Sequence, residues 1–121
     1  MSNRLLLLWG VVLPLFAQTY TGSIRGRVTD PAGLAVPKAQ VTITEISTNS
    51  LSKTETNDVG DYMVSFLKPG DYRAIFSAAG FKEVVQTGMR LQLNQSMTVD
   101  AVMQIGAVNE KVAGVSSDSE R

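Results

Sequence analysis

Between residues 22 and 106, apolar and polar side chains alternate with a period of two, in short runs separated by glycine, proline, asparagine and aspartate. Successive side chains of a β-strand point to opposite faces, so this alternation gives each strand one apolar face. No stretch of helix length shows the 3.6-residue period of an amphipathic helix. The pattern predicts a small all-β domain of short strands joined by tight turns.

We expect about seven or eight short strands, enough for a single small antiparallel β-sandwich with one core. The main inward sets are Ile24, Gly26 and Val28; Val41 and Ile43; Tyr62 and Val64; Tyr72, Ala74, Phe76 and Ala78; Met89, Leu91 and Leu93; and Met97, Val99, Ala101 and Met103. The polar run Leu51 to Thr56 is typical of an edge strand, and the run from 72 to 78, apolar on both faces, is typical of a central one. The last two sets are expected to pair as a terminal hairpin.

The amino terminus has the pattern of a secretory signal peptide. One basic residue, Arg4, precedes an uncharged apolar run from Leu5 to Phe16. That run is shorter than the roughly 20 residues that a membrane-spanning helix needs, and Ala17 supplies the small side chain that signal peptidases require. We therefore expect cleavage after residue 17, a short linker over 18–22, the domain over 23–106, and an exit segment with a polar tail over 107–121. A buried apolar helix of a cytosolic domain is the alternative interpretation of the same residues.

Composition excludes several classes of function. Without its signal peptide the chain has 10 basic and 11 acidic residues. This near-neutral balance does not predict binding to nucleic acid or to anionic membranes. It contains no cysteine and no histidine, so the usual zinc ligands, a disulfide framework and the bases and nucleophiles of common hydrolases are missing. We expect no enzymatic activity, no cofactor and no metal. A calcium site at Asp58, Asp61 and Asp71 is an alternative, although aspartate is also favoured beside turns for its bonds to nearby backbone.

Several strand-and-turn motifs stand in a fixed order along the chain. They are Gly26 to Gly33 with Pro37 to Val41, then Thr56 to Tyr62, Leu67 to Tyr72, and Ala79 to Phe81. Together they resemble the carboxypeptidase regulatory-like domains, which have a transthyretin-like, carbohydrate-binding-like β-sandwich fold. The resemblance covers roughly residues 21 to 112.

Within these motifs we expect structural rather than catalytic or ligand-binding roles. Glycines at tight turns supply positive φ, and the two tyrosines that follow such glycines point inward and need hydrogen-bond partners for their hydroxyls. The residues concerned are Gly26, Asp30, Gly33, Gly60, Tyr62, Pro69, Gly70, Tyr72, Gly80 and Phe81.

The signal peptide followed by one such domain and the exit segment from Ile105 to Val112 is similar to the amino-terminal extension of TonB-dependent receptor-like outer-membrane proteins of Gram-negative bacteria. This resemblance implies a non-catalytic exported binding or scaffolding module, in the periplasm or at the periplasmic side of the outer membrane, with secretion as the alternative. Its partner would be an envelope protein or the receptor barrel, which this chain lacks; a truncated receptor fragment and a free-standing module both stay open. The segments Leu51 to Thr56 and Val108 to Val112 are candidate docking edges, since an unpaired strand can extend another sheet.

Carbohydrate binding is the second candidate function, because starch-binding modules have a similar sandwich. Sugar platforms need exposed aromatic rings, and the single tryptophan, Trp9, lies in the signal peptide. Tyr62, Tyr72, Phe76 and Phe81 are expected to point inward. Tyr20 and Phe66 remain as candidate platforms, with linker or core roles favoured for both.

Overall fold

The computed structural model describes residues 21–106 and 111–113 of the 121-residue chain. The predicted signal peptide over 1–17 lies outside the described residues, as do most of the linker and most of the polar tail. Strand β1 begins at Gly22, within the predicted linker.

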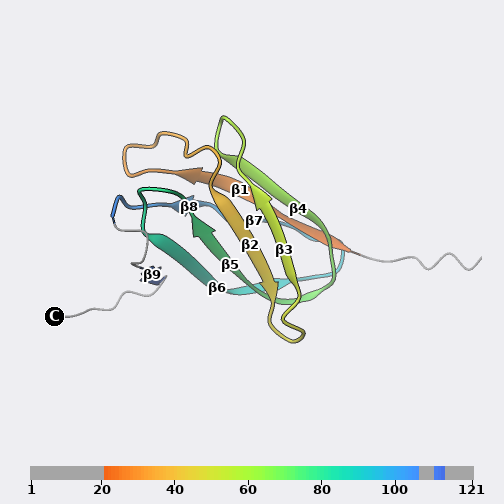
Figure 1. The fold of residues 1–121 in the computed structure, drawn as a ribbon. Helices are drawn as coiled ribbons and strands as arrows, with labels where there is room; N and C mark the ends of the chain where they lie inside the picture. The colour runs from red at the N-terminus through yellow and green to blue at the C-terminus, as the bar shows by residue number, and fades with distance from the viewer. Residues whose placement is uncertain (1–20, 107–110, 114–121) are drawn as a thin grey trace, which may run out of the picture.

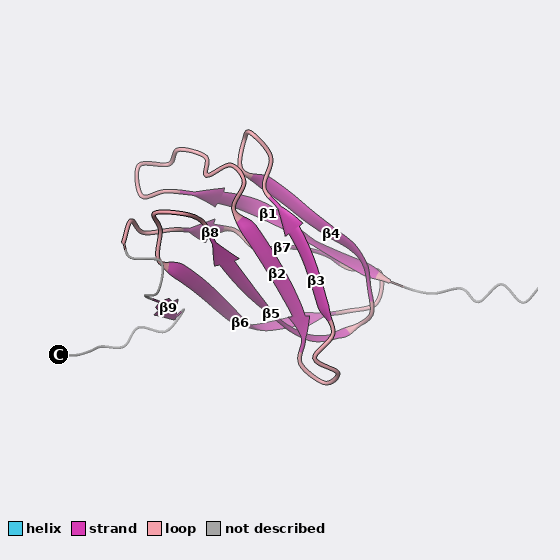
Figure 2. Ribbon diagram, viewed as in Figure 1, coloured by secondary structure: helices cyan, strands magenta, loops and turns pink. Residues whose placement is uncertain are grey.

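The described residues form nine β-strands and no helix (Figures 1 and 2). The strands are β1 (Gly22–Thr29), β2 (Gln40–Glu45), β3 (Leu51–Glu55), β4 (Asp61–Leu67), β5 (Gly70–Ser77), β6 (Glu83–Leu91), β7 (Ser96–Thr98), β8 (Ala101–Val102) and β9 (Lys111–Ala113). One sheet has the order β4-β1-β7, with β8 also paired to β1, and the other has the order β3-β2-β5-β6-β9. The predicted all-β sandwich is thus confirmed, and no segment of the described chain is a helix that could cross a membrane.

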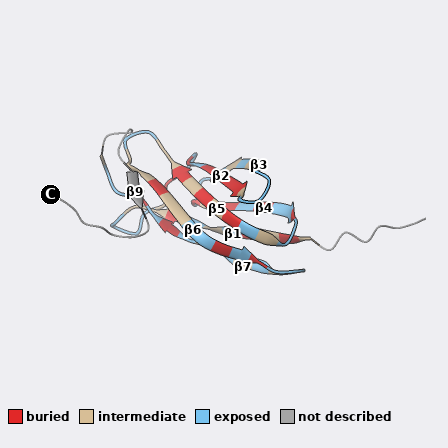
Figure 3. Cartoon of the chain, turned by 90° about the horizontal axis from the view of Figure 1, so that it is seen from below, coloured by how far each residue is buried: buried red, intermediate tan, exposed pale blue. Residues whose placement is uncertain are grey.

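The core lies between the two sheets, and Figure 3 shows buried positions alternating with more exposed ones along the strands. Its largest fully buried side chains are Phe76, Ile24, Ile43, Leu91, Met103, Val28 and Val41. The rings of Tyr62 and Phe76 meet edge to face, with centroids 5.6 Å apart, an arrangement that aromatic rings prefer. Strands β1, β2, β4 and β5 therefore place their apolar faces as the alternation predicts.

The predicted terminal hairpin is wrong. Strand β6 runs unbroken from Glu83 to Leu91, while β7 and β8 leave it and pair parallel to β1 in the other sheet. A turn over 92–95, in which Gln95 accepts a hydrogen bond from the Gln92 backbone N–H (2.7 Å), carries the chain across. The alternation correctly shows that Ala101 and Met103 face the core. It does not show to which sheet they belong, because core-facing residues of both sheets recur with the same period of two. The sheets are consequently mixed, with the pairs β1·β7, β1·β8 and β6·β9 parallel.

Strand β6 contains Met89 and Leu91 of the predicted inward set but begins earlier, at Glu83. Its pairing with β5 shifts from Tyr72↔Met89 to Ala74↔Gln86, which marks a β-bulge. Gly88 lies in this bulge with φ +73°, a conformation that glycine adopts without strain. The bulge keeps Met89 and Leu91 buried after the interruption.

The edge and centre positions of the five-stranded sheet match the prediction. Strand β3, the polar run, lies at one edge, and β5 lies between β2 and β6. At the other edge β9 pairs with β6 through the register Glu83↔Lys111. The second candidate docking segment therefore ends in a strand that already belongs to the sheet.

Thr56 joins the end of β3 to the long β1–β2 connection. It is buried with 4% of its surface exposed; its hydroxyl donates to the Val36 carbonyl (2.6 Å) and accepts from the Ala39 N–H (2.8 Å). The Thr56 backbone N–H donates to the Ala39 carbonyl (3.0 Å), and the Lys38 N–H donates to the Thr56 carbonyl (3.0 Å). This one residue thus satisfies buried backbone groups that neither sheet pairs.

We expect Thr56→Val to lower the free energy of unfolding by about 1–3 kcal/mol, because the near-isosteric change leaves a buried carbonyl and a buried N–H without partners. Urea denaturation of the full chain checks this. The control is Thr54→Val on the edge strand β3, where we expect a change within about 0.5 kcal/mol. Equal losses in the two variants would show that the hydroxyl of Thr56 has no special role.

Candidate functional site

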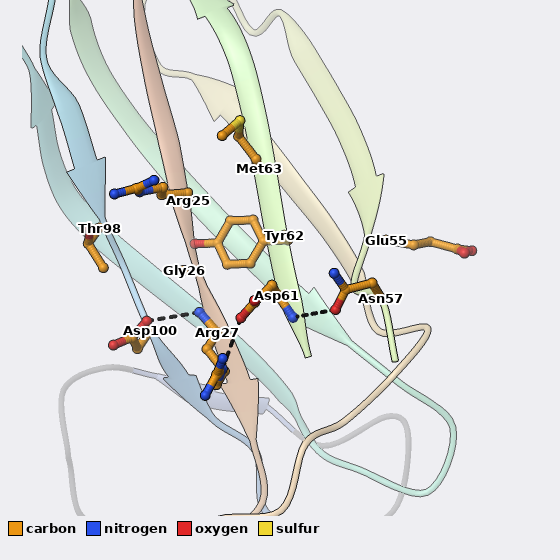
Figure 4. Close-up of a pocket in the computed structure, with 10 residues that line it drawn as sticks. All are labelled: Arg25, Gly26, Arg27, Glu55, Asn57, Asp61, Tyr62, Met63, Thr98 and Asp100. Carbon is orange, nitrogen blue, oxygen red and sulfur yellow. Dashed lines mark hydrogen bonds and ion pairs between the residues drawn. The ribbon is translucent and has the colours of Figure 1, made fainter. Parts of the chain in front are cut away.

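A hollow of about 670 Å³ lies over the four-stranded sheet and its margin (Figure 4). Strands β1, β4 and β7 supply its floor, and the end of β3 and the loops that follow β3 and β7 supply the rest. Its lining residues are Arg25, Gly26, Arg27, Glu55, Asn57, Asp61, Tyr62, Met63, Thr98 and Asp100. The register of the sheet brings them together, since Arg25 is paired with Met63 on one side and with Thr98 on the other.

The hollow lies where the chain between β7 and β8 departs from regular pairing with β1. The Val99 N–H donates to the Arg25 carbonyl (2.7 Å), but the Arg27 N–H donates to Oδ1 of Asp100 (2.8 Å). A carboxylate oxygen thus takes the place of a backbone carbonyl in the ladder. A Cβ atom at Gly26 would lie 1.9 Å from the Val99 carbonyl oxygen, so this close approach requires glycine.

Tyr62 forms the inner wall of the hollow. Its hydroxyl donates to the same Val99 carbonyl at 2.6 Å, and only 4% of the residue is exposed. Burial, reinforced by the negative charge of Asp100, raises the pKa of the Tyr62 hydroxyl well above its ordinary value. The phenol therefore stays protonated at neutral pH and acts as a structural donor, not as an acid or a nucleophile.

The charged groups of the hollow are of both signs. Arg27 Nε donates to Oδ1 of Asp61 at 2.9 Å, and this hydrogen bond, followed by the charge of Asp61, raises the pKa of Arg27. Both side chains are about half exposed (57% and 46%), so salt screens the pair. Arg25 is exposed beside it and, among the described residues, its guanidinium has no ion-pair or hydrogen-bond partner. Arg25 is thus available to a ligand or a partner.

The carboxylates do not gather into a metal site. Within 21–106 and 111–113 no group of three or more histidine, cysteine, aspartate or glutamate side chains could hold a metal ion. Asp61 pairs with Arg27, while Asp71 pairs with Arg90 at 3.3 Å. Asp58 is exposed in the β3–β4 turn. What this arrangement can do chemically is hydrogen bonding and charge pairing.

The residues predicted to be structural do not form one site. Gly26 and Tyr62 line the hollow, whereas the others lie at turns on both ends of the sandwich. In the β1–β2 connection Asp30 Oδ1 accepts from the N–H groups of Ala32 and Leu34, both at 2.9 Å, and Gly33 has φ +86°.

The remaining motif residues shape three further turns. Gly60 has φ +84°, and a Cβ there would lie 2.6 Å from the Val28 carbonyl. Tyr72 is buried and donates to the Lys68 carbonyl at 2.6 Å, across the turn that holds the exposed Pro69 and the partly buried Gly70. Gly80 has φ +86°, and Phe81, half-buried against the core, forms a bridge with Ile105.

Two residues with clear roles were missed from the sequence. Thr56 reads as one more polar position of an edge strand, and Asp100 as one more outward position of an alternating run. Phe66, a candidate platform for which a linker or core role was favoured, is 85% exposed and so has no core role. One signal for Asp100 is that aspartate is depleted in strands, so its presence marks an interruption of the pairing.

Comparison with known sequences places the domain in a family context. The sequence model of the carboxypeptidase regulatory-like domain matches residues 23–104. The TonB-dependent transporter Oar of Myxococcus xanthus is 32% identical over 120 residues, which cover 91% of this chain and 11% of that protein. The chain thus spans about a tenth of the length of the curated relative that it matches.

Solved structures share the fold at low sequence identity. A putative carbohydrate binding protein from Bacteroides uniformis superimposes with a TM-score of 0.56 and 16% identity over 68% of this chain and 40% of that one. The Bacillus anthracis TIE protein gives 0.61 and 14% over 71% and 17% of the two chains. Hydroxyquinol 1,2-dioxygenase from Pseudomonas putida gives 0.57 and 10% over 74% and 58%. At such identities these likenesses show the fold alone.

The buried hydroxyl of Tyr62 predicts a loss of stability at alkaline pH. The pKa of this group is raised in the folded state above the 10.0 of an unfolded chain, so its contribution is fully present below pH 10 and is lost as the pH rises above it. The loss approaches about 1.4 kcal/mol per pH unit for this one group.

Urea denaturation of the wild type and of Tyr62→Phe between pH 8 and pH 11.5 checks the prediction. We expect the wild type to lose stability above about pH 10 more steeply than Tyr62→Phe; Tyr72, whose pKa is also raised, remains in both. Parallel curves for the two proteins would contradict it.

Proposed function

Because the chain belongs to the carboxypeptidase regulatory-like domain family, we propose that it is a non-catalytic binding and scaffolding module of an exported cell-envelope protein, comparable with the amino-terminal extension of a TonB-dependent receptor. The observation that carries this proposal is the 32% identity to the TonB-dependent transporter Oar, which extends over 91% of the chain. The module would act in the periplasm or at the periplasmic side of the outer membrane, and the apolar run over residues 5–16 would export it.

The topology places the two ends of the β1–β8 region at opposite ends of the sandwich. Strands β1 and β8 are parallel neighbours, and the last residues of both, Thr29 and Val102, are paired. The described chain therefore enters at one end of the sandwich and reaches β8 at the other (Figure 1). The strands thus separate the amino-terminal end of β1 from the chain that follows β8.

The hollow on the four-stranded sheet is our candidate contact surface. It combines the unpaired Arg25, the Arg27–Asp61 pair and Met63, which is 51% exposed. Arginine and methionine are enriched in protein interfaces, and a surface with both signs of charge selects a partner with the complementary pattern. The partner would be an envelope protein or the barrel of a receptor.

A non-catalytic role also agrees with the chemistry of the chain. It has no histidine and no cysteine, and the tyrosine hydroxyl in the hollow already donates to a backbone carbonyl. Asp61 and Asp100 each accept a hydrogen bond within the fold. The side chains that remain available can hold a polar surface but do not form a nucleophile–base pair.

Export is tested by expressing the full chain in a Gram-negative host and measuring the intact mass of the protein released by osmotic shock. We expect the mass of residues 18–121, because Ala17 offers the small residue at the cleavage position. The control Leu7→Arg places a charge in the apolar run and should leave an unprocessed cytoplasmic chain. A wild-type chain that is found in the cytoplasm with residues 1–17 still attached would contradict the proposal.

The contact surface is tested by photo-crosslinking in the native host, with benzoylphenylalanine placed at Met63 of the full chain. We expect one adduct with a periplasmic or outer-membrane protein, identified by mass spectrometry, and its loss when Arg25→Glu is added. The matched control position is Thr87, which is exposed on the five-stranded sheet. Equal adducts from both positions, or none from Met63, would refute this surface as the contact.

A further inference from the structure

Phe66, near the end of β4, is exposed in an unusual way. The pairing of β4 with β1 shifts from Ile24↔Val64 to Gly22↔Leu67, so three steps along β4 oppose two along β1. Within this β-bulge Phe66 adopts φ +61°. The ring is 85% exposed, while Leu67, the next residue, returns to the core with 6% exposure. The bulge thus directs the ring into solvent.

This conformation has a cost that core packing does not offset. A left-handed backbone is unfavourable for a bulky side chain, and an exposed phenyl ring adds no buried area to the fold. Residues held in this way are concentrated at ligand-binding sites and other functional positions. The positive φ and the exposed ring of Phe66 together favour a ligand that packs against the ring.

The surroundings of the ring indicate which chemistry it serves. Phe66 borders a hollow of about 290 Å³ at the end of the sandwich where β1 begins. The other lining residues are Thr21, Gly22, Ser23, Ser65, Asn94, Gln95 and Ser96. Among the described residues, hydroxyl and amide groups thus surround a single aromatic ring, and no lining side chain is charged.

Some polar groups of the lining already have hydrogen-bond partners within the fold, and others have none among the described residues. The Gln95 carbonyl accepts from the Ser23 N–H at 2.9 Å, and its amide oxygen accepts from the Gln92 N–H. Among the described residues, the side chains of Ser65 and Asn94 have no hydrogen-bond partner. Asn94 also has positive φ, +56°. The hollow therefore places an exposed ring beside a hydroxyl and an amide that have no hydrogen-bond partner among the described residues.

We propose that this hollow is a subsite for one neutral sugar ring of a saccharide chain. The face of Phe66 stacks on the apolar C–H face of the sugar, and Ser65 and Asn94 hydrogen-bond its hydroxyls. The volume lies at the lower limit of ligand pockets, about 300 Å³, which suits a single ring. A protein contact is disfavoured because such contacts gather several anchoring side chains at their centre, and here the ring is the only large apolar side chain of the lining.

The subsite is separate from the hollow on the four-stranded sheet and shares no lining residue with it. It adds a ligand to the scaffolding module that we propose above without depending on the crosslinking partner. Loss of sugar binding would leave the Met63 adduct in place, and loss of the adduct would leave sugar binding in place. The two proposals therefore fail independently.

The test begins with the full chain on an array of neutral and acidic oligosaccharides, followed by calorimetric titration with the best neutral hexasaccharide. We expect saturable binding by the wild type and by Phe66→Trp. In Phe66→Asn we expect binding to weaken at least about tenfold, in the range of a lost aromatic anchor. Because asparagine tolerates positive φ, the thermal midpoint of this variant should not fall.

The matched control is Leu93→Asn, which removes a 55%-exposed apolar side chain from the neighbouring loop outside the lining. It should bind the hexasaccharide as the wild type does. The proposal is overturned if no oligosaccharide binds at millimolar concentration, if acidic sugars are preferred over neutral ones, or if Phe66→Asn binds like the wild type.

Discussion

The Val99 carbonyl is a junction at which three parts of this fold meet. It accepts the hydroxyl of Tyr62 at 2.6 Å and can approach β1 so closely only because residue 26 has no side chain. The ring of the same tyrosine packs on Phe76 of the opposite sheet. One residue therefore ties a strand of the four-stranded sheet, the β7–β8 connection and the centre of the core. In a chain without cysteine, such hydrogen-bonded and packed junctions take the role that disulfides have in many small exported domains.

The sequence was informative wherever the determining physics is local. Alternation identified most inward positions, with Leu93 an exception at 55% exposure, and the turn residues located the points where the chain reverses, because each depends on neighbours along the chain. The order of strands was less accessible. Met103 is buried as expected, but its neighbours in the sequence do not indicate to which sheet it belongs. The predicted hairpin therefore gave β7 and β8 the wrong partner strand. Pairing with β1 is decided by contacts more than seventy residues apart in sequence, such as the bond from Arg27 to Asp100.

The candidate sites illustrate the same limit more sharply. Arg25 and Met63 are ordinary exposed positions of two separate strands until the register pairs them. Phe66 belongs to the inward class by residue type, and only the bulge in β4 turns it outward. Bulges depend on the partner strand and leave little trace in a single sequence. Both hollows therefore come from irregularities of pairing, which strand alternation does not reveal.

The arrangement of β1 and the β7–β8 segment has a mechanical consequence. Because β1 and the β7–β8 segment are parallel neighbours, a pull on the two ends of this region would draw the strands past each other along their length. The hydrogen bonds between them would then share the force and break together, not open one after another from an end. Resistance to such a pull is governed by the unfolding rate under force and not by equilibrium stability. A cysteine-free domain of this topology would in this way resist a pull along its strands without any disulfide.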